Sequence, residues 1–445
     1  MIWTIARREF LEYLKSMRFL MGFLVTIALV ALSTVINVND YRERLSDYST
    51  AMKEMAGDRY PLVVYRPPEV LSTLVQGLDR TLGNRADIMP NMNPVRTSGY
   101  MVNYASRHHQ FVAGFSSVDF SFVVRIILSL MVIFLAYNAV AGEKSAGTLR
   151  LMLSNPVPRY SVLLGKIAGG LMLVLVSLLA AMIVALLILV TNPAVALSRS
   201  DWIRIGGMGV VSTLYLVSVF ALSICVSVIV DRPSTSLLIL LQAWIFLVVL
   251  YPAGAVIVAE QWHVLPSEDE IADRKKAAFQ SFEKDYEDIQ KAFGDSLRKT
   301  AHVPLDLDLR HHDADVRQGE VYHAVDIAVA LDQNVQLHLA EWISVMSPAS
   351  LYDQAMVRLG RTGAEEFDTF IRCINHTWEE YIAVVRSRIS NPAERKRAHN
   401  PEFHAQQEPD EASFLAALPR VIVLVLLLLI PFMTAHAKFN TKDVR

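Results

Sequence analysis

The chain has little cysteine and little charge. Only two of its 445 residues are cysteines, Cys225 and Cys373, which is too few for a disulfide framework or a Cys-based zinc site. Charged residues make up 19%, against about 25% in a typical soluble domain. The net charge of −2 excludes a broadly basic nucleic-acid binder, so we expect no nucleic-acid partner. The sequence also lacks G-x-x-x-x-G-K-[ST] and G-x-S-x-G, so we expect neither a nucleotide cradle nor a hydrolase nucleophile in this chain.

Long apolar runs account for the high content of apolar residues. Apolar residues make up 53% of the chain, and the mean hydropathy is +0.33. A helix needs about 20 apolar residues to cross a hydrocarbon core of about 30 Å. Six stretches meet this length: 19–38, 120–141, 167–190, 206–230, 237–259 and 416–435. The sequence therefore predicts an all-α polytopic membrane protein with six transmembrane helices, the fifth of them kinked near Pro252 and Gly254.

The distribution of Lys and Arg predicts how these spans are oriented, because basic residues in short flanks stay on the cytoplasmic side. The basic flanks are Arg7, Arg8, Lys15 and Arg18 before span one, Lys144, Arg150, Arg159 and Lys166 in the 142–166 loop, and Lys438, Lys442 and Arg445 in the 436–445 tail. All three flanks fall on one side of the predicted bundle. We therefore expect both termini in the cytoplasm and two long extracytoplasmic segments, 39–119 and 260–415.

The second outer segment, 260–415, has the pattern of a mainly helical domain. Ser267 and Glu270 predict a capping box that begins one long amphipathic helix ending near Thr300. We expect a loop over 302–319, helices over 320–345, after Pro348 and over 365–389, and an extended chain from 392 to 410. The first outer segment is rich in proline, and only 70–82 predicts a short helix there.

Before the first span, residues 2–17 have the spacing of an amphipathic helix lying at the membrane surface. The apolar residues of this face are Ile2, Ala6, Phe10, Leu14 and Met17. Basic residues occupy other faces of the same helix. The pattern alone does not distinguish a surface helix from an ordinary basic amphipathic segment that precedes a transmembrane helix.

One cytoplasmic segment carries a recognisable order of residues. It begins Gly142-Glu143-Lys144-Ser145-Ala146-Gly147-Thr148-Leu149-Arg150-Leu151-Met152-Leu153, continues Ser154-Asn155-Pro156-Val157-Pro158-Arg159 and ends Gly165-Lys166. This order resembles the signature of ABC-2 type transporter permeases. The stretch Leu153-Ser154-Asn155-Pro156-Val157-Pro158-Arg159 most resembles the branch that includes the permeases of nitrous-oxide reductase maturation and gliding motility. Three shorter pieces also resemble that branch: Ala6-Arg7-Arg8-Glu9-Phe10, Tyr65-Arg66-Pro67-Pro68 and Ser347-Pro348.

The resemblance implies roles for residues in two segments. Residues 1–18 would form the elbow helix, with Arg7, Arg8 and Phe10 in it, and 142–166 would contain the coupling helix that contacts an ATPase. The implied coupling residues are Glu143, Gly147, Thr148, Leu149, Arg150, Met152 and Arg159. From the residues alone, Gly147 can end one helix, and the apolar side chains that follow give a short surface helix its buried stripe. An ordinary positive-inside loop remains the alternative.

The resemblance also implies a function and partners. The chain would be the membrane-spanning permease of a transporter in a bacterial inner membrane, and it would couple ATP hydrolysis to export of a substrate that the sequence does not identify. Two ATPase subunits would hold the ATP and Mg²⁺, this chain would hold no cofactor, and a second permease, identical or paralogous, would complete a dimer. Two alternatives stay open: mechanical transmission to an extracytoplasmic partner without transport, and an ATP-independent receptor or scaffold.

Two further groups of polar residues call for an interpretation. Arg125 is the one obvious charge inside a span, and we expect it to form a structural ion pair or to snorkel outward rather than to line a substrate path. The outer histidines are His302, His311, His312, His323 and His338. Their spacing matches no defined metal motif, so we interpret them as solvated surface residues and predict no metal site.

Overall fold

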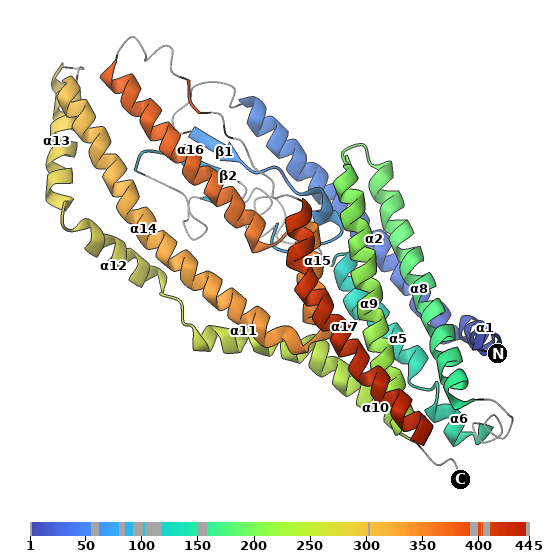
Figure 1. The fold of residues 1–445 in the computed structure, drawn as a ribbon. Coiled ribbons are helices and arrows are strands. Elements are labelled where there is room, and N and C mark those ends of the chain that lie inside the picture. The colour runs from blue at the N-terminus through green and yellow to red at the C-terminus, as the bar shows by residue number, and fades with distance from the viewer. Residues whose placement is uncertain are drawn as a thin grey trace.

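The computed structural model describes residues 2–54, 62–79, 85–91, 101–102, 118–148, 158–300, 303–391, 399–401, 403 and 410–441. Helices dominate these residues, and the strands form one small antiparallel sheet. Figure 1 shows a helical bundle at one end of an elongated molecule and a lobe of long helices at the other. The prediction of an all-α polytopic membrane protein is confirmed.

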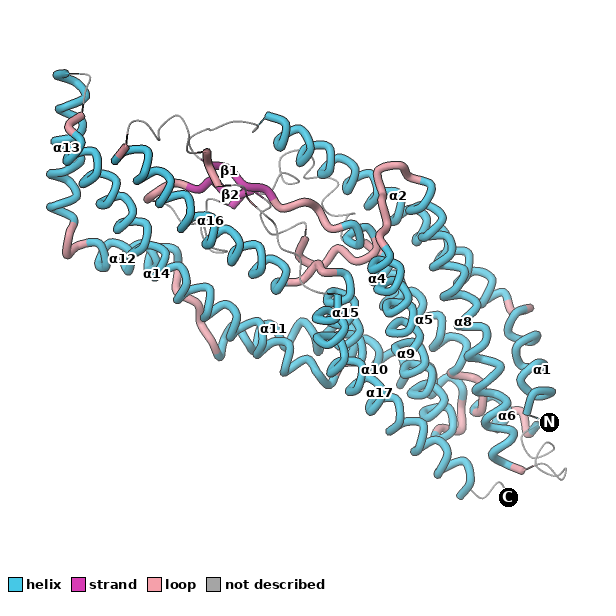
Figure 2. Tube along the Cα trace, turned by 45° about the horizontal axis from the view of Figure 1, so that its top comes forward, coloured by secondary structure: helices cyan, strands magenta, loops and turns pink. Residues whose placement is uncertain are grey.

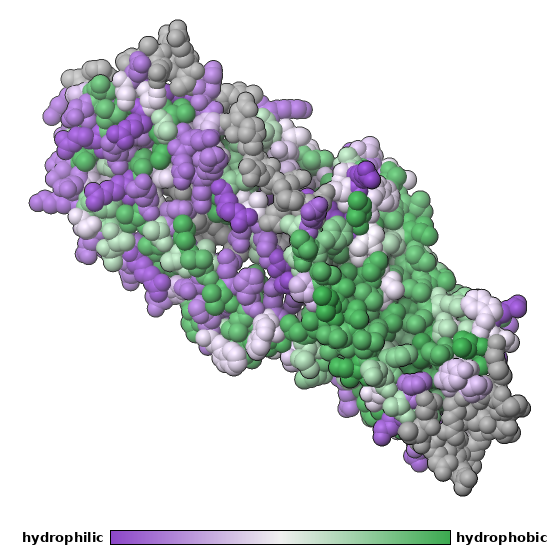
Figure 3. All heavy atoms as spheres, in the orientation of Figure 1, coloured by the Kyte–Doolittle hydropathy of each residue, from purple (hydrophilic) through white to green (hydrophobic). Residues whose placement is uncertain are grey.

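Among the described residues, six helical segments are long and apolar enough to cross a membrane: Met17–Lys53, Phe120–Ser145, Tyr160–Thr191, Arg199–Ile229, Pro233–Trp262 and Glu411–Phe439. Each contains one of the six stretches expected from the sequence or overlaps most of it. Four of these spans are single helices: α2 (Met17–Glu54), α8 (Arg159–Thr191), α9 (Arg199–Ile229) and α17 (Asp410–Thr441). The second and fifth spans each combine several shorter elements. Figure 3 shows apolar side chains covering the bundle and polar side chains covering most of the lobe.

The second and fifth spans are not regular α-helices. The second span consists of α4 (Phe120–Phe122), the π-helix η3 (Val123–Leu128), α5 (Ser129–Ala136), a turn over 137–140 and α6 (Ala141–Ser145). The fifth consists of α10 (Pro233–Trp244), the π-helix η4 (Ile245–Leu250) and α11 (Tyr251–Trp262). Pro252 is the second residue after η4, as expected for a proline that removes a backbone donor and disturbs the preceding turn. In Figures 1 and 2, α11 runs away from the bundle toward the lobe.

The lobe is built from α12 (Glu268–Phe279), α13 (Glu283–Thr300), α14 (Leu305–Ile343) and α16 (Ala364–Ser390). The capping box of Ser267 and Glu270 is confirmed at the start of α12. The prediction of one helix from there to Thr300 is wrong, because the chain turns over 280–282. This turn lets Phe279 and Phe282 both become buried, with ring centroids 4.5 Å apart, and Phe279 also meets Tyr322 of α14.

The loop expected over 302–319 is a second wrong prediction, because α14 begins at Leu305. Asp306 and Asp308, which suggested a loop, lie in its first turn, where carboxylates favour the positive end of the helix dipole. Gly319 lies inside this helix, where a Cβ atom would be 2.7 Å from the carbonyl oxygen of Pro90. The glycine therefore marks a close approach of the chain rather than a break.

The small sheet covers α16. Strands β1 (Leu62–Tyr65), β2 (Arg85–Ile88) and β3 (Met101–Val102) are antiparallel, with Leu62 opposite Ile88 and Arg85 opposite Val102. Val64, Ala86 and Ile88 share a core with Phe367, Phe370, Ile374, Trp378 and Tyr381 of α16. The helix predicted over 365–389 and its apolar face are confirmed, while the extended chain predicted from 392 to 410 lies largely outside the described residues.

Most of the helix expected over 70–82 is absent from its described part, 70–79. Within that part the helical residues are those of the 3-10 turn η1 (Val70–Thr73), and Gly77 then has φ +49. Leu78 N donates to Thr362 O over 2.7 Å, so the chain bends to meet the loop before α16.

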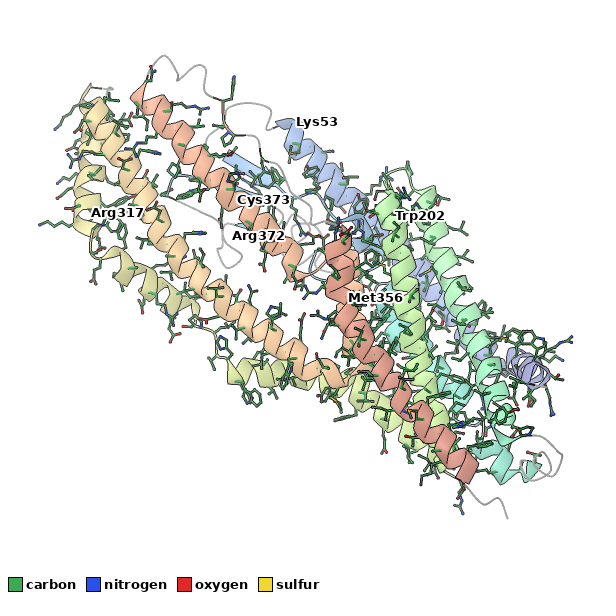
Figure 4. The ribbon with its side chains drawn as sticks, in the orientation of Figure 1. Lys53, Trp202, Arg317, Met356, Arg372 and Cys373 are labelled. Carbon is green, nitrogen blue, oxygen red and sulfur yellow. The ribbon has the colours of Figure 1, made fainter. Side chains whose placement is uncertain are left out.

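One short helix of the second outer segment lies inside the bundle rather than in the lobe. Helix α15 (Pro348–Gly360) follows the 3-10 turn η5 (Ser344–Met346) and packs against α9 and α17. Its residues Leu351, Tyr352, Met356 and Leu359 belong to the same core as the spans, and Figure 4 shows Met356 beside α17. The outer segment is therefore anchored between the spans.

Helix α1 (Ile2–Leu14), α6 and the C-terminal end of α17 lie at the end of the bundle opposite to the lobe (Figure 1). The described ends of the permease-like signature, 142–148 and 158–166, and the helical lobe are therefore on opposite sides, as the predicted topology requires. The two free cysteines are also separated, because Cys225 is buried in α9 and Cys373 lies on α16 of the lobe (Figure 4).

Candidate functional site

The N-terminal helix packs tightly on α8 because α8 has two glycines one turn apart. A Cβ atom at Gly165 would lie 2.7 Å from Cβ of Ile5, and one at Gly169 would lie 2.6 Å from the carbonyl oxygen of Ala6. Small residues four apart let two helices approach closely in this way. Gly165 and Gly169 thus form the surface of α8 on which α1 packs.

The packed face of α1 differs in part from the apolar face that the sequence suggested. Ala6 and Glu9 are buried, and Phe10 packs against the bundle core. Ile2 and Leu14 are exposed, and Met17 already belongs to α2. Arg7 and Arg8 are exposed on another face, beside Thr4, Leu11, Glu12 and Lys15.

A buried lysine joins α1 to the segment that carries the signature. The ammonium of Lys166 on α8 lies 2.6 Å from Oε1 of Glu9 and 2.7 Å from Oε1 of Glu143. The Lys166 side chain is 3% exposed, while those of Glu9 and Glu143 are 11% and 22% exposed. We call Glu9, Lys166 and Glu143 the ion cluster. It fixes α1, α6 and α8 to one another at the end of the bundle that faces away from the lobe.

The same segment is bound to α9 through the residue next to Glu143. Lys144 Nζ donates to the carbonyl oxygen of Val228 and, over 3.1 Å, to that of Val230, at the C-terminal end of α9. A cation suits this position because the last carbonyl groups of a helix have no partner within it. Ser227 Oγ accepts from Val140 N and Ala141 N at 3.1 and 3.0 Å, which caps the start of α6.

The structure places some of the predicted coupling residues and leaves others undescribed. Gly147 has φ +73 and follows the end of α6, so the prediction that this glycine ends a helix is confirmed. Thr148 is exposed and its hydroxyl donates to Glu143 O over 3.3 Å. Leu149, Arg150 and Met152, with the short surface helix expected there, lie outside the described residues, and Arg159 opens α8. Their contacts with an ATPase remain predictions.

Sequence reasoning did not identify Glu9 and Lys166 as site residues. Both occur in stretches used for the family resemblance, but no role was inferred for either. A usable signal existed for one of them: a lysine seven residues into an apolar helix is costly to bury unless a carboxylate pairs with it.

At the other end of the bundle, Arg125 is paired, as expected, but with a residue far away in sequence. Its guanidinium donates to Asp353 of α15, and the two side chains are each 29% exposed. Asp119, the nearer carboxylate in sequence, instead caps α4 by accepting from Phe122 N. The prediction of a structural ion pair is confirmed, with α15 supplying the partner.

Helix α15 also contacts the irregular parts of both spans. Tyr215 on α9 donates to Arg125 O in η3 over 2.9 Å and stacks on Tyr352 of α15 with centroids 4.8 Å apart. Ser347 donates to Leu247 O in η4 over 2.6 Å. π-Helical turns leave carbonyl groups with weakened helical partners, and these side chains supply the missing donors. Helix α15 therefore links spans two and five to the lobe.

The histidines do not gather into a metal site in the described part of the chain, where no three His, Cys, Asp or Glu side chains could hold one ion. The ring of His311 stacks on Phe293 with centroids 3.9 Å apart and bonds to Gln290. His312 is buried, and burial lowers its pKa. His302 lies outside the described residues.

Comparison with known proteins agrees with the geometry. The sequence profile described as ABC-2 family transporter protein matches residues 3–444. The chain belongs to the ABC-2 transporter family. A probable ABC transporter permease protein NosY from Pseudomonas aeruginosa is 34% identical over 164 residues, which cover 34% of this chain and 58% of that protein. A second, from Stutzerimonas stutzeri, is 32% identical over 126 residues, covering 28% of this chain and 45% of that protein.

The resemblance that the signature suggested is thus confirmed at the level of the family. This ABC-2 chain matches only about half the length of these curated relatives, and the matched region is about a third of its own length. Family membership and the six spanning helices make it a multi-pass membrane protein.

Proposed function

We propose that this chain is the membrane-spanning permease subunit of an ATP-driven transporter, with both termini in the cytoplasm of a bacterium. The ion cluster carries the proposal. It joins α1, α6 and α8 on the side opposite to the lobe, and the signature segment lies between α6 and α8. A protein docked on that segment would therefore push on three helices at once.

The proposed coupling runs through α6. Glu143 ties α6 to α8 and α1, while Lys144 and Ser227 tie it to the end of α9. When two ATPase subunits close on ATP, they would displace the segment after Gly147, and these polar contacts would pass the displacement to the spans. Packed interiors deform little, so the spans would move as rigid bodies rather than absorb the push.

A second permease copy, identical or paralogous, is part of the proposal. In the most apolar 18-residue window of the fifth span only 11% of the residues are buried, and in that of the sixth only 17%, against 67% in the second. Apolar faces that one chain leaves uncovered in this way suit a neighbouring permease as well as lipid.

The test is copurification of an ABC ATPase encoded beside this gene. We expect Arg150→Glu combined with Arg159→Glu to remove the ATPase from the purified complex, because the charge reversal falls on the proposed docking segment. Arg199→Glu is the matched control, since Arg199 is exposed at the start of α9, at the opposite end of the bundle. Equal ATPase recovery in both variants, or a chain that functions without any nucleotide-hydrolysing partner, would contradict the proposal.

Mechanical transmission without transport is the second candidate, and α15 is the observation that favours it. Through Asp353 and Ser347 this helix contacts spans two and five, and its ends continue into the lobe helices α14 and α16. A tilt of either span would thus move the lobe. ATP-dependent solute movement in reconstituted vesicles would exclude this version.

A further inference from the structure

A groove runs along the outside of the bundle between α2 and the second span. Its volume is about 380 Å³. Met21, Gly22 and Val25 line it from α2, Met131 and Phe134 face them from α5, and Arg18 stands at the end nearest α1. Apart from Arg18, the residues that line the groove are apolar.

The floor of the groove depends on a glycine. A Cβ atom at Gly22 would lie 3.0 Å from Cγ of Met131, which is tighter than ordinary packing. Larger side chains before and after Gly22 rise on the outer face, where Met21 is 64% and Val25 is 49% exposed. The groove is therefore open along its length to whatever surrounds the bundle.

Arg18 is held in place at the end of this groove. Its Nη1 donates to the hydroxyl of Tyr137 over 2.6 Å, and its guanidinium carbon lies 5.7 Å from the centroid of that ring. Arg18 is nevertheless exposed, as is Lys15 in the turn between α1 and α2. A guanidinium has five N–H donors and matches the oxygen geometry of a phosphate, so Arg18 can bond a phosphate while it donates to Tyr137.

The order of these groups along α2 fits one kind of ligand. Arg18 precedes the apolar part of α2 and lies beside the turn after α5, at the end of the span that the proposed function places at the membrane surface next to α1. The apolar lining extends from there into the span. We propose that the groove binds an anionic phospholipid of the leaflet next to α1, with one acyl chain between α2 and α5 and the phosphate at Arg18.

This inference rests on the membrane placement in the proposed function, but it requires neither nucleotide nor an ATPase. A bound lipid would fill the gap beside the start of α2, which α1 directly precedes in the chain. The lipid would thus brace the same end of the bundle as the ion cluster.

The test uses the full chain in nanodiscs with equal parts of phosphatidylglycerol and phosphatidylcholine, followed by native mass spectrometry of the lipids retained per chain. We expect one retained phosphatidylglycerol. Arg18→Gln should lower its preference over phosphatidylcholine about fivefold, the factor equivalent to about 1 kcal/mol for one cation at an anionic surface. Val25→Trp should prevent retention of either lipid by filling the groove.

Two control variants match these changes elsewhere. Arg232→Gln removes an exposed arginine between α9 and α10, and Leu187→Trp enlarges a side chain of α8 that is 59% exposed. Both should retain the lipid as the unchanged chain does, and all variants should elute and melt alike. The proposal would be overturned if Arg18→Gln and Val25→Trp retained the same lipids as the unchanged chain. It would also be overturned if the unchanged chain showed no preference between the two headgroups. A change from dimer to monomer in Val25→Trp would also overturn it, because a second copy would then occupy the groove.

Discussion

Replacing Lys166 by methionine is the most direct perturbation of the ion cluster. Methionine keeps the length and the apolar stem of lysine but removes the ammonium that lies 2.6 Å from Glu9 and 2.7 Å from Glu143. Two carboxylates then face each other across an apolar side chain. We expect α1 to detach from Gly165 and Gly169 of α8, and α6 to lose the ion pair that Glu143 makes with α8.

The size of the effect follows from burial. Removing one partner of a buried ion pair costs about 3–5 kcal/mol, because the remaining charge has lost its solvation and its partner. Glu143 is 22% exposed and can turn toward water, whereas Glu9 is only 11% exposed. One carboxylate therefore bears most of the cost, and we expect a loss of about 3 kcal/mol in the free energy of unfolding.

The assay is equilibrium unfolding in mixed micelles, combined with a compensating variant. The triple change Glu9→Gln, Lys166→Met and Glu143→Gln leaves no unpaired charge, and such neutral replacements commonly cost little, so its stability should return to within about 1 kcal/mol of the unchanged chain. Lys53→Met serves as the matched control, because Lys53 is exposed at the far end of α2 (Figure 4). It should unfold as the unchanged chain does.

Two results would refute this reasoning. If Lys166→Met lost no more stability than Lys53→Met, the cluster would not hold these helices together. If the triple variant were as unstable as Lys166→Met, the loss would arise from packing rather than from uncompensated charge. ATPase recovery from the triple variant is a separate readout, because a stable chain that no longer binds the ATPase would assign the cluster to coupling.

Three further predictions concern other parts of the molecule. Gly169→Leu should separate α1 from α8 at a cost of about 1–3 kcal/mol and open α1 to protease, whereas Gly254→Leu, with nothing within 4 Å of its Cβ position, should not. Arg125→Met should cost about 2 kcal/mol in unfolding experiments, less than a fully buried pair, and adding Asp353→Asn should restore most of it; an additive double variant would contradict the pairing. Burial raises the pKa of Glu69 to about 8 from 4.5, so the native chain keeps a proton that the unfolded chain releases, and stability should fall as pH rises from about 4.5 through 8. Glu69→Gln should flatten that slope, and equal slopes in thermal unfolding would count against it.

Local patterns predicted the elements whose stabilising contacts are local in sequence. The six apolar runs, the capping box at Ser267 and the glycine stop at Gly147 depend on neighbouring residues, and all three are found in the structure. The errors arose where distant residues decide. The aspartates of 302–319 suit the first turn of a helix as well as a loop, and the long helix is stabilised by packing against α12, α13 and α16, which lie elsewhere in the sequence.

The sequence alone determined that the chain has six spans and that it resembles the ABC-2 permeases, because hydropathy, charge and motif order are properties of the chain itself. That 142–166 faces an ATPase remains a prediction. Only the tertiary structure decided which charges meet. Lys166 pairs with Glu143 and with Glu9, which is 157 residues away in the sequence. Arg125 pairs with Asp353, which is 228 residues away. Such pairs form because a buried charge requires a partner, and which partner is in reach depends on how the helices pack.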